Sequence, residues 1–211
     1  MSDVLLLNAD WFPLRAITWQ KAIEHVFDGK AAIVEAVEGK YVRSPSLAYP
    51  WPSVVVLKRY STVRGRIKFS GRNVQARDFY ACSYCGRRPL LPDGRPDRSA
   101  LTIDHVIPKA QAKEYQVYVR GLKRWIPQTC WLNCVCACRQ CNVRKADRRP
   151  EQAGMQLRMR PREPTREDIA RMSVARVKRI RPEWRPYLPS TWLTALGLVA
   201  VSDDIGTADA Q

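Results

Sequence analysis

A set of polar residues suited to metal-assisted hydrolysis lies close to two pairs of cysteines. Asp104 and His105 are adjacent, Asn133 follows, and Asn142 comes directly after the last cysteine. Imidazole accepts a proton near neutral pH, and a divalent ion stabilises charge on a phosphate. These residue types are therefore those that hydrolysis of a phosphodiester needs. The flanking pairs are Cys82 with Cys85 and Cys138 with Cys141.

Each cysteine pair has the Cys-x-x-Cys spacing, which places two thiolates on one side of a zinc ion. Two such pairs complete a tetrahedral shell, and Gly86 after the first pair suits a tight turn. The segment between the pairs is much longer than in a zinc finger or ribbon, which leaves room for a functional insert. We predict one structural zinc ion, held by Cys82, Cys85, Cys138 and Cys141.

The other cysteines are Cys130, Cys134 and Cys136. They have no partner at the two-residue spacing, so we interpret them as buried thiols rather than ligands. Cys134 and Cys136 alternate on an expected strand and would share one of its faces. An exchange of Cys136 for Cys138 in the zinc shell stays open.

Residues 101–108 form a short, β-prone apolar run that the Asp-His pair interrupts and a proline ends. A lone histidine is more often structural than catalytic. This chain has only two histidines, and His105 is the one that lies between the cysteine pairs and beside a carboxylate. We therefore predict a catalytic role for His105.

The order of these motifs along the chain is Cys-x-x-Cys, Leu-Thr-Ile-Asp-His-Val-Ile-Pro, Trp-Leu-Asn and Cys-x-x-Cys-Asn-x-x-Lys. This order resembles the HNH endonucleases of the four-cysteine kind over about residues 76–150. The opening stretch Leu-Leu-Leu-Asn-Ala-Asp-Trp-Phe-Pro-Leu is also similar to the N-terminal region of phage and bacterial members. The resemblance implies a ββα-metal finger, with one strand ending at Asp104-His105, a second near 134–137, and a helix over about 139–147.

The resemblance also implies a role for each polar residue. His105 would be the general base, and Asp104 and Asn142 would bind a catalytic Mg²⁺ or Mn²⁺ ion, since both offer oxygen ligands. Asn133 would brace the loop and orient His105. Lys145 would either meet the phosphate or be a solvated charge on a basic helix.

Residues 111–129 form a longer and more aromatic insert than this family suggests, and Leu132 stands where members tend to carry an acidic residue. The insert contains Tyr115, Tyr118 and Trp125 together with basic residues. Two interpretations stay open for it: an elongated hairpin that contacts DNA, or an extended loop.

We expect a small α+β unit at the N-terminus, because hydrophobic periodicity there changes between strand and helix types. Thr18 is a suitable helix N-cap, and Gly29 a suitable helix end. Residues 44–52 are broken by prolines. The expected elements are a strand over 4–7, a helix over 19–27, a hairpin of 31–37 with 40–43 joined by Glu38-Gly39, and a strand over 53–57.

The segment that follows is strongly basic and carries no acidic residue over 58–77. A run of one sign beside a candidate metal site favours contact with phosphates over a merely solvated surface. Tyr60 and Phe69 lie within the run and either stack on bases or belong to the core. The basic residues are Lys58, Arg59, Arg64, Arg66, Lys68, Arg72 and Arg77.

The C-terminal part is also basic. Thr165 is a suitable N-cap for a helix over 166–179, and Asp168 completes a variant capping box. Three prolines then interrupt regular structure around Trp184, Tyr187 and Trp192, which we expect to pack back onto the body. Residues 202–211 are small and polar, which predicts disorder.

The bulk composition points to an acidic partner. The chain has 211 residues, a net charge of +16 and 45% hydrophobic residues, so it can bury a core and still attract polyanions. No stretch is long and apolar enough to span a membrane, and the first residues do not form a signal peptide. We expect a cytoplasmic protein whose partner is duplex DNA.

The sequence therefore predicts an α+β fold in which a zinc-stapled nuclease domain (76–150) lies between an N-terminal unit with a basic linker (1–75) and a basic helical extension (151–211). The predicted function is metal-dependent DNA cleavage, by nicking or double-strand cutting. The alternatives are a zinc-stapled DNA-binding protein without catalysis and an accessory factor that works with phage packaging or mobile-element proteins. The sequence does not indicate an oligomeric state.

Overall fold

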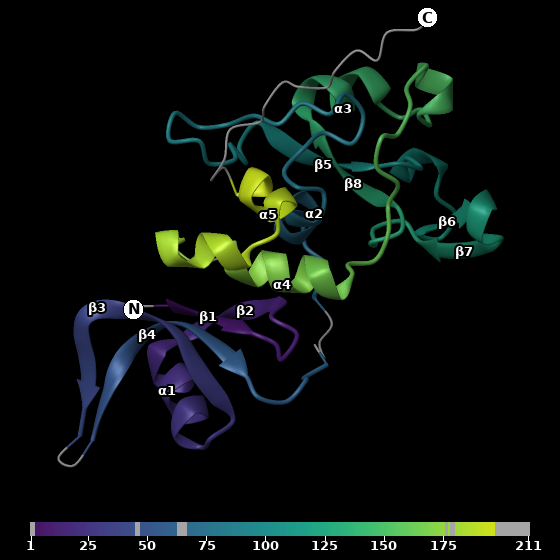
Figure 1. The fold of residues 1–211 in the computed structure, drawn as a ribbon. Coiled ribbons are helices and arrows are strands. Elements are labelled where there is room, and N and C mark those ends of the chain that lie inside the picture. Colours follow the sequence, from purple (N-terminus) through teal and green to yellow (C-terminus); the bar gives the residue numbers. More distant parts are fainter. Residues whose placement is uncertain (1–2, 45–46, 63–66, 176, 178–179, 197–211) are drawn as a thin grey trace, which may run out of the picture.

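The computed structural model describes residues 3–44, 47–62, 67–175, 177 and 180–196. It has mixed α and β structure, which confirms the predicted class. Three parts are distinguished below: the sheet unit (3–57), the cysteine unit (71–155) and the C-terminal segment (166–196). The C-terminal segment lies between the other two (Figure 1).

The sheet unit contains four strands in the order β2-β1-β4-β3. β1 pairs antiparallel with β2 and parallel with β4, and β4 pairs antiparallel with β3. The helix α1 follows β2 directly, and the predicted N-cap Thr18 accepts a hydrogen bond from the backbone N–H of Lys21. The bounds are β1 Asp3–Leu7, β2 Pro13–Thr18, α1 Trp19–Phe27, β3 Ala31–Arg43 and β4 Ala48–Leu57.

β1 is apolar at four consecutive positions because both of its faces are covered. Val4 and Leu6 pack in the cluster that includes Ala22 of α1. Leu5 and Leu7 pack in the opposite cluster, against residues of the C-terminal segment. Successive side chains of a strand point to opposite faces, so an unbroken apolar run is what a central strand requires.

The predicted hairpin of 31–37 with 40–43 is wrong. These residues form one long strand, β3, and its partner is β4. The register shifts between Ala36 and Tyr41, and Gly39 has a φ of +67°, so Glu38-Gly39 makes an irregularity within the strand rather than a turn.

The proline-rich stretch also differs from the prediction, because residues 48–52 belong to β4. Pro50 and Pro52 pair with β3 on one side, while β1 pairs with β4 only from Val54 to Val56. Proline lacks a backbone N–H donor, and a strand portion with one neighbour tolerates that loss. β2, which begins at Pro13, was not predicted.

The cysteine unit contains the strand, strand and helix that the sequence predicts. β5 and β8 pair antiparallel, with Leu101 opposite Cys138 and His105 opposite Cys134. α3 begins directly after β8 and ends at Lys145, two residues before the predicted end. A further helix, α2, was not predicted. The bounds are α2 Gly71–Arg77, β5 Leu101–His105, β8 Cys134–Cys138, α3 Arg139–Lys145 and the 3-10 helix η3 Glu151–Ala153.

The insert after β5 contains a hairpin rather than only an extended loop, and its contact with DNA stays a prediction. β6 and β7 pair antiparallel, and Tyr118 lies opposite Trp125. Val117 and Ile126 face inward and pack on Ile107, close to the end of β5. The bounds are η1 Lys109–Gln111, β6 Gln116–Val119, η2 Arg120–Leu122 and β7 Arg124–Pro127.

The C-terminal segment begins with α4 (Arg166–Val174), which has the predicted capping box between Thr165 and Asp168. The helix ends earlier than predicted, and parts of 175–179 lie outside the described residues, as do 202–211. Around the prolines the chain forms two short helices, η4 (Pro182–Tyr187) and α5 (Ser190–Ala195). Trp184 and Trp192 are fully buried, which confirms that this region packs back onto the body.

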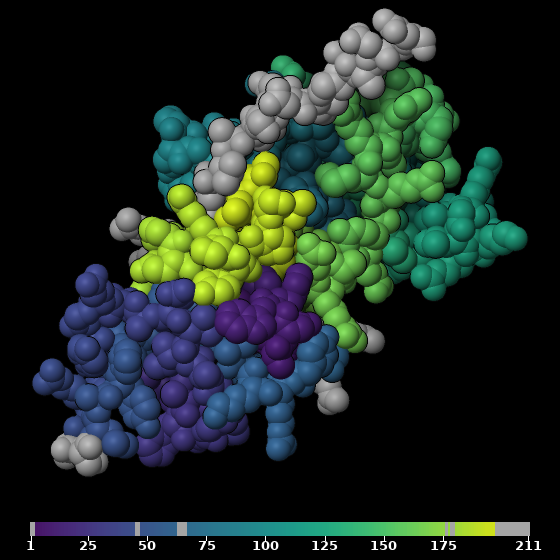
Figure 2. Space-filling view, in the orientation of Figure 1, coloured from purple at the N-terminus to yellow at the C-terminus, as the bar shows by residue number. Residues whose placement is uncertain are grey.

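The helix α4 contacts both units (Figure 2). Ala170 and Val174 belong to the cluster on the sheet, whereas Met172 belongs to the core of the cysteine unit. The side chain of Arg171, which is 2% exposed, donates to the backbone carbonyls of Ala76 and Arg77. Within the described part of the chain, no helix is long and apolar enough to cross a membrane.

Candidate metal centre and hydrolytic site

The two cysteine pairs come together as predicted. The sulfur atoms of Cys82, Cys85, Cys138 and Cys141 all lie within 4.8 Å of one another. The first pair lies in the turn after α2, and the second spans the end of β8 and the first turn of α3. The backbone N–H of Ser83, inside the first pair, donates to the carbonyl of Cys136 on β8, which brings together ligands that are far apart in the sequence.

The spacing of the sulfur atoms suits a zinc ion. A zinc–sulfur bond of about 2.3 Å implies sulfur–sulfur separations near 3.8 Å in a tetrahedron. The Sγ atoms of Cys85 and Cys138 are 3.9 Å apart. The four cysteines are thus close enough to bind a metal ion, and the donor set is that of a structural zinc site.

The ionisation of these thiols also favours a bound cation. Burial, followed by neighbouring thiols, raises the pKa of Cys141, and burial likewise raises the pKa of Cys85. Burial also opposes ionisation of Cys82, but backbone N–H groups outweigh it and lower the pKa of that thiol. Four thiolates in one place are stable only with a compensating charge, which a divalent ion supplies.

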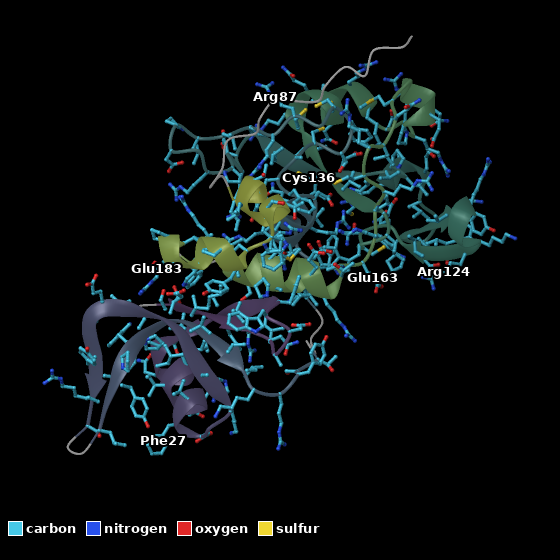
Figure 3. The ribbon with its side chains drawn as sticks, in the orientation of Figure 1. Phe27, Arg87, Arg124, Cys136, Glu163 and Glu183 are labelled. Carbon is cyan, nitrogen blue, oxygen red and sulfur yellow. The ribbon has the colours of Figure 1, made fainter. Side chains whose placement is uncertain are left out.

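The remaining cysteines are structural. Cys134 and Cys136 are fully buried on one face of β8, and Cys136 lies inside the unit (Figure 3). Burial raises the pKa of Cys134 to about 12 and raises that of Cys136 as well. Cys130 packs against the cluster beneath the hairpin. The exchange of Cys136 for Cys138 is not observed, because Cys136 is outside the four-sulfur group.

Asp104, on β5, is 5% exposed, and both of its carboxylate oxygens are engaged. Oδ1 accepts from the ammonium group of Lys145 at 3.0 Å, and Oδ2 accepts a short hydrogen bond from the Tyr84 hydroxyl. Each carboxylate oxygen can accept more than one bond, so the carboxylate retains acceptor capacity. Asp104 thus joins α3 to the first cysteine turn.

Lys145 is 1% exposed, so the interpretation of a solvated charge is wrong. Its ammonium group also donates to the backbone carbonyl of His105 at 2.9 Å. A buried ammonium needs an anionic partner, and Asp104 is that partner. Lys145 is buried rather than solvated because α3 packs along β5, which brings the last turn of the helix over the Asp-His pair.

His105 is partly buried, and its Nε2 atom lies 2.9 Å from the hydroxyl oxygen of Thr129, at the end of the insert. The ring therefore lies near the surface rather than in the core. Burial lowers the pKa of His105 below its usual value, and the charges of Lys109 and Lys145 lower it further, against the opposing effect of Asp104. The imidazole is mostly neutral at pH 7.

Asn133 is 1% exposed and ties two loops together. Its side chain accepts from the backbone N–H of Ile107 and donates to the carbonyls of Ile107 and Gln128. These bonds hold Ile107, two residues after His105, and Gln128, directly before Thr129. These contacts brace two loops, and the orientation of His105 by Asn133 stays a prediction.

Asn142 lies on α3, one turn before Lys145, and is partly buried. Its side chain forms no hydrogen bond with any residue that the structure describes. Among those residues, the four cysteines are also the only group of three or more Cys, His, Asp or Glu side chains close enough to share an ion. A second ion would therefore take few protein ligands.

The basic run does not act as one surface. Arg77 is fully buried, so its predicted contact with phosphates is wrong. Its guanidinium pairs with Asp78 and donates to the carbonyls of Trp131, Cys134 and Arg162. Lys58, Arg59, Lys68 and Arg72 are exposed, and Arg64 and Arg66 lie outside the described residues.

Two residues of the site were missed from the sequence. Tyr84 is buried within the first cysteine turn, and Thr129 closes the insert. An aromatic residue with a hydroxyl inside a metal-binding turn is a weak signal on its own, because its partner comes from a strand that is distant in the sequence. Nothing around Thr129 indicates its contact with His105.

Comparison with known proteins gives one match. The family model described as HNH endonuclease-associated, N-terminal domain matches residues 4–65. This stretch contains all of the sheet unit except Asp3, covers less than a third of the chain, and does not include the cysteine cluster. No curated protein and no solved structure match the chain. The match supports an HNH-associated family and hints at a relationship to HNH nucleases.

Proposed function

We propose that this protein is a metal-dependent endonuclease of the HNH type that hydrolyses phosphodiester bonds of duplex DNA. The observation that carries the proposal is the convergence of β5, β8 and α3, which places Asp104, His105 and the helix that bears Asn142 beside a four-cysteine cluster. The N-terminal match to an HNH-associated family supports it.

In this proposal, His105 is the general base. Its lowered pKa leaves the imidazole neutral at pH 7, as a proton acceptor must be. When Nε2 carries the proton and donates to Thr129, Nδ1 has the free lone pair. A water molecule gives its proton to His105 and attacks phosphorus in line, the bond from phosphorus to the 3′ oxygen breaks, and the 3′ oxygen takes a proton from solvent. The products are a 5′-phosphate and a 3′-hydroxyl.

Asp104 and Asn142 are proposed to hold the catalytic ion, Mg²⁺ or Mn²⁺, through oxygen atoms. Such an ion, when bound, stabilises negative charge on the scissile phosphate and on the leaving oxygen. Mg²⁺ typically uses one or two protein side chains and completes its shell with water and substrate phosphates, which suits two ligands. Tyr84 and Lys145 act as positioning residues, because they fix the direction of the Asp104 carboxylate.

The insert hairpin is proposed to contact the substrate next to His105. Its outer face carries Tyr118 and Trp125, whose ring centroids are 5.6 Å apart, and Arg124 projects from its far end (Figure 3). Aromatic faces stack on bases and cationic side chains attract phosphates. Because Thr129 ends the same insert, substrate held on the hairpin would lie near the imidazole.

One observation favours the second candidate, a zinc-stapled DNA-binding protein without catalysis. The ion pair of Asp104 with Lys145 satisfies the carboxylate without any second metal. The two candidate functions make different predictions about Mn²⁺ binding. The nuclease requires Mn²⁺ or Mg²⁺ to bind at Asp104, whereas the binding protein does not.

The test is conversion of supercoiled plasmid to open-circle or linear DNA with Mg²⁺ or Mn²⁺, together with Mn²⁺ titration by electron paramagnetic resonance. We expect cleavage by the parent protein, and loss of Mn²⁺ binding in Asp104→Asn at unchanged zinc content. A parent protein that retains DNA but neither cleaves it nor binds Mn²⁺ is the second candidate.

A further inference from the structure

A second feature that can bind a ligand lies in the sheet unit, away from the Asp-His pair. A hollow of about 990 Å³ opens between the end of α1 with the turn that follows it and the chain that leaves β4. Leu6, Leu14 and Leu57 contribute to its apolar lining, and the first two of these are buried in the core. Its other lining residues include Arg15, Lys30, Lys58, Arg59, Tyr60 and His25.

The charge of this hollow is one-sided. It contains one acidic residue, Asp28, which is paired with Lys30 at 2.7 Å. Arg15, Lys58 and Arg59 are exposed and form no ion pair with any residue in the described ranges. Cations that line a concave surface concentrate the electric field that attracts an anion. Charges scattered over a flat surface do not have this effect.

The wall of the hollow is fixed before any ligand binds. The side chain of Asn8, at the end of β1, accepts from the backbone N–H of Ser61 at 2.8 Å and donates to its carbonyl at 3.1 Å. Asn8 is 2% exposed. The backbone N–H of Lys58 donates to the carbonyl of Lys30, which joins the two sides. Binding of a ligand here would therefore carry a small entropic cost, because the chain that lines the hollow is already ordered.

Two properties favour a nucleic acid over a small anion or an acidic protein. The exposed ring of Tyr60, which is 63% accessible, offers an aromatic face on which a base can stack, and the partly exposed Leu57 lies beside it in the lining. His25 has a pKa lowered by burial and then by cations including Lys21, Lys30 and Arg15, so it adds a neutral polar ring rather than another charge. A basic rim around an apolar and aromatic interior matches phosphates and bases together.

The position of the hollow along the chain connects it with the hydrolytic site. The chain that lines it enters the described structure again at Ile67, and the ring of Phe69 packs edge-on against Trp131 at 5.3 Å. Trp131 lies two residues after Thr129, the partner of His105. Lys58 and Arg59 at the hollow and Phe69 near the insert thus belong to the same basic segment of the sequence.

We propose that this hollow binds a strand of nucleic acid, with phosphates on Arg15, Lys58 and Arg59 and a base against Tyr60. The sheet unit then holds the substrate at a distance from the bond that is cut. The choice of a nucleic acid rests on the proposed function, but binding in the hollow does not require the chain to be a nuclease.

The experiment measures binding of short fluorescein-labelled single-stranded and duplex oligonucleotides by anisotropy over a range of salt concentrations. The full chain carries His105→Ala throughout, so that cleavage does not interfere. The hollow variant is Lys58→Glu with Arg59→Glu. The matched control is Lys40→Glu with Arg43→Glu, an equal charge change on β3 that lies outside the hollow lining.

We expect the hollow variant to lower affinity at low salt on the order of ten-fold. It should also reduce the slope of log affinity against log salt by about 2, because two phosphates are no longer neutralised by the protein. The control should keep the parent slope. Tyr60→Ala should weaken single-strand binding by about five-fold or more. Lys58→Gln with Arg59→Gln, checked by thermal unfolding, gives the same direction if the glutamate variant fails to fold.

Three results would overturn this assignment. Equal losses in the hollow variant and the control would mean that only net charge matters. An unchanged slope in the hollow variant would mean that no phosphate is bound there. Loss of affinity for inorganic phosphate or a mononucleotide, with oligonucleotide binding unchanged, would make the site one for a small phosphate. Failure of plasmid cleavage by the parent, with the expected salt slopes, would overturn the nuclease proposal and leave this one standing.

Discussion

The sheet unit and the cysteine unit stabilise their interiors by different means. The sheet unit buries Val4, Leu5, Leu6 and Leu7 with valines of β4 between two layers of helices. The core of the cysteine unit contains cysteines, tyrosines and small residues, and buried charges lie around it. With cysteines in its core and charges buried around it, the cysteine unit depends on its metal ligands and ion pairs as well as on apolar packing.

The comparison also locates the chemistry. The site residues lie in the unit that is held together by directional contacts, in which each side chain has one orientation. The sheet unit, with its nonspecific apolar packing, carries an open basic hollow. We infer that the first arrangement suits positioning of reactive groups and the second suits holding a substrate.

The largest expected effect is that of metal removal. Chelation, or Cys82→Ser, should unfold the cysteine unit and leave the sheet unit largely folded, because a structural zinc contributes on the order of 10 kcal/mol at pH 7. Hydrogen exchange should show loss of protection in β5 and β8 but not in β1 and β4. Zinc content of zero in a fully folded sample would contradict the difference between the units.

The next effect concerns the boundary between the units, where Arg171 of α4 pairs with Asp168 and binds the carbonyls of Ala76 and Arg77. Arg171→Ala should lower the free energy of unfolding by about 3 to 5 kcal/mol, since it leaves buried partners without a donor. Urea unfolding measures this. Arg166→Ala, at an exposed position of the same helix, is the control and should change stability little.

A smaller effect is expected for the link between the cysteine turn and the hydrolytic site. Tyr84→Phe removes the hydroxyl that donates to Asp104 and should cost about 1 to 3 kcal/mol of stability. It should also weaken Mn²⁺ binding, because the carboxylate loses one of the two groups that orient it. Tyr115→Phe, 82% exposed, serves as the control. Unchanged Mn²⁺ affinity in Tyr84→Phe would remove Tyr84 as a positioning residue.

The smallest effect is a shift in pH dependence. A general base acts when it is unprotonated, so the rate should fall as pH falls through the pKa of His105. Because burial and then Lys109 lower that pKa, the acidic limb should lie below the ordinary histidine value of about 6.5. Lys109→Gln should move this limb toward higher pH. A limb above 6.5 in the parent would contradict the assignment.

Local signals predicted much of this structure. The helix caps at Thr18 and Thr165 depend on residues within one turn, and both are observed. The cysteine pairs are defined by a two-residue spacing, and the sulfur atoms come together. Features of this kind are set by chemistry between near neighbours, so a single sequence is enough to find them.

Local signals did not predict the contacts between segments that are distant in the sequence. The partner of β3 was misjudged because Gly39 resembles a hairpin turn, while the true partner follows residue 47. Arg77 and Lys145 are buried because Asp78 and Asp104 neutralise them, and the second of these pairs joins β5 to α3. The sequence alone does not distinguish a basic residue in such a buried ion pair from one on a solvated surface.

The most direct test of the central claim is plasmid cleavage by the parent protein and by His105→Ala, at equal zinc content and equal DNA retention. The account predicts that the parent converts supercoiled plasmid to open-circle or linear DNA with Mg²⁺ or Mn²⁺ and that the variant does not. Equal cleavage by both proteins would contradict the assignment of His105 as the base.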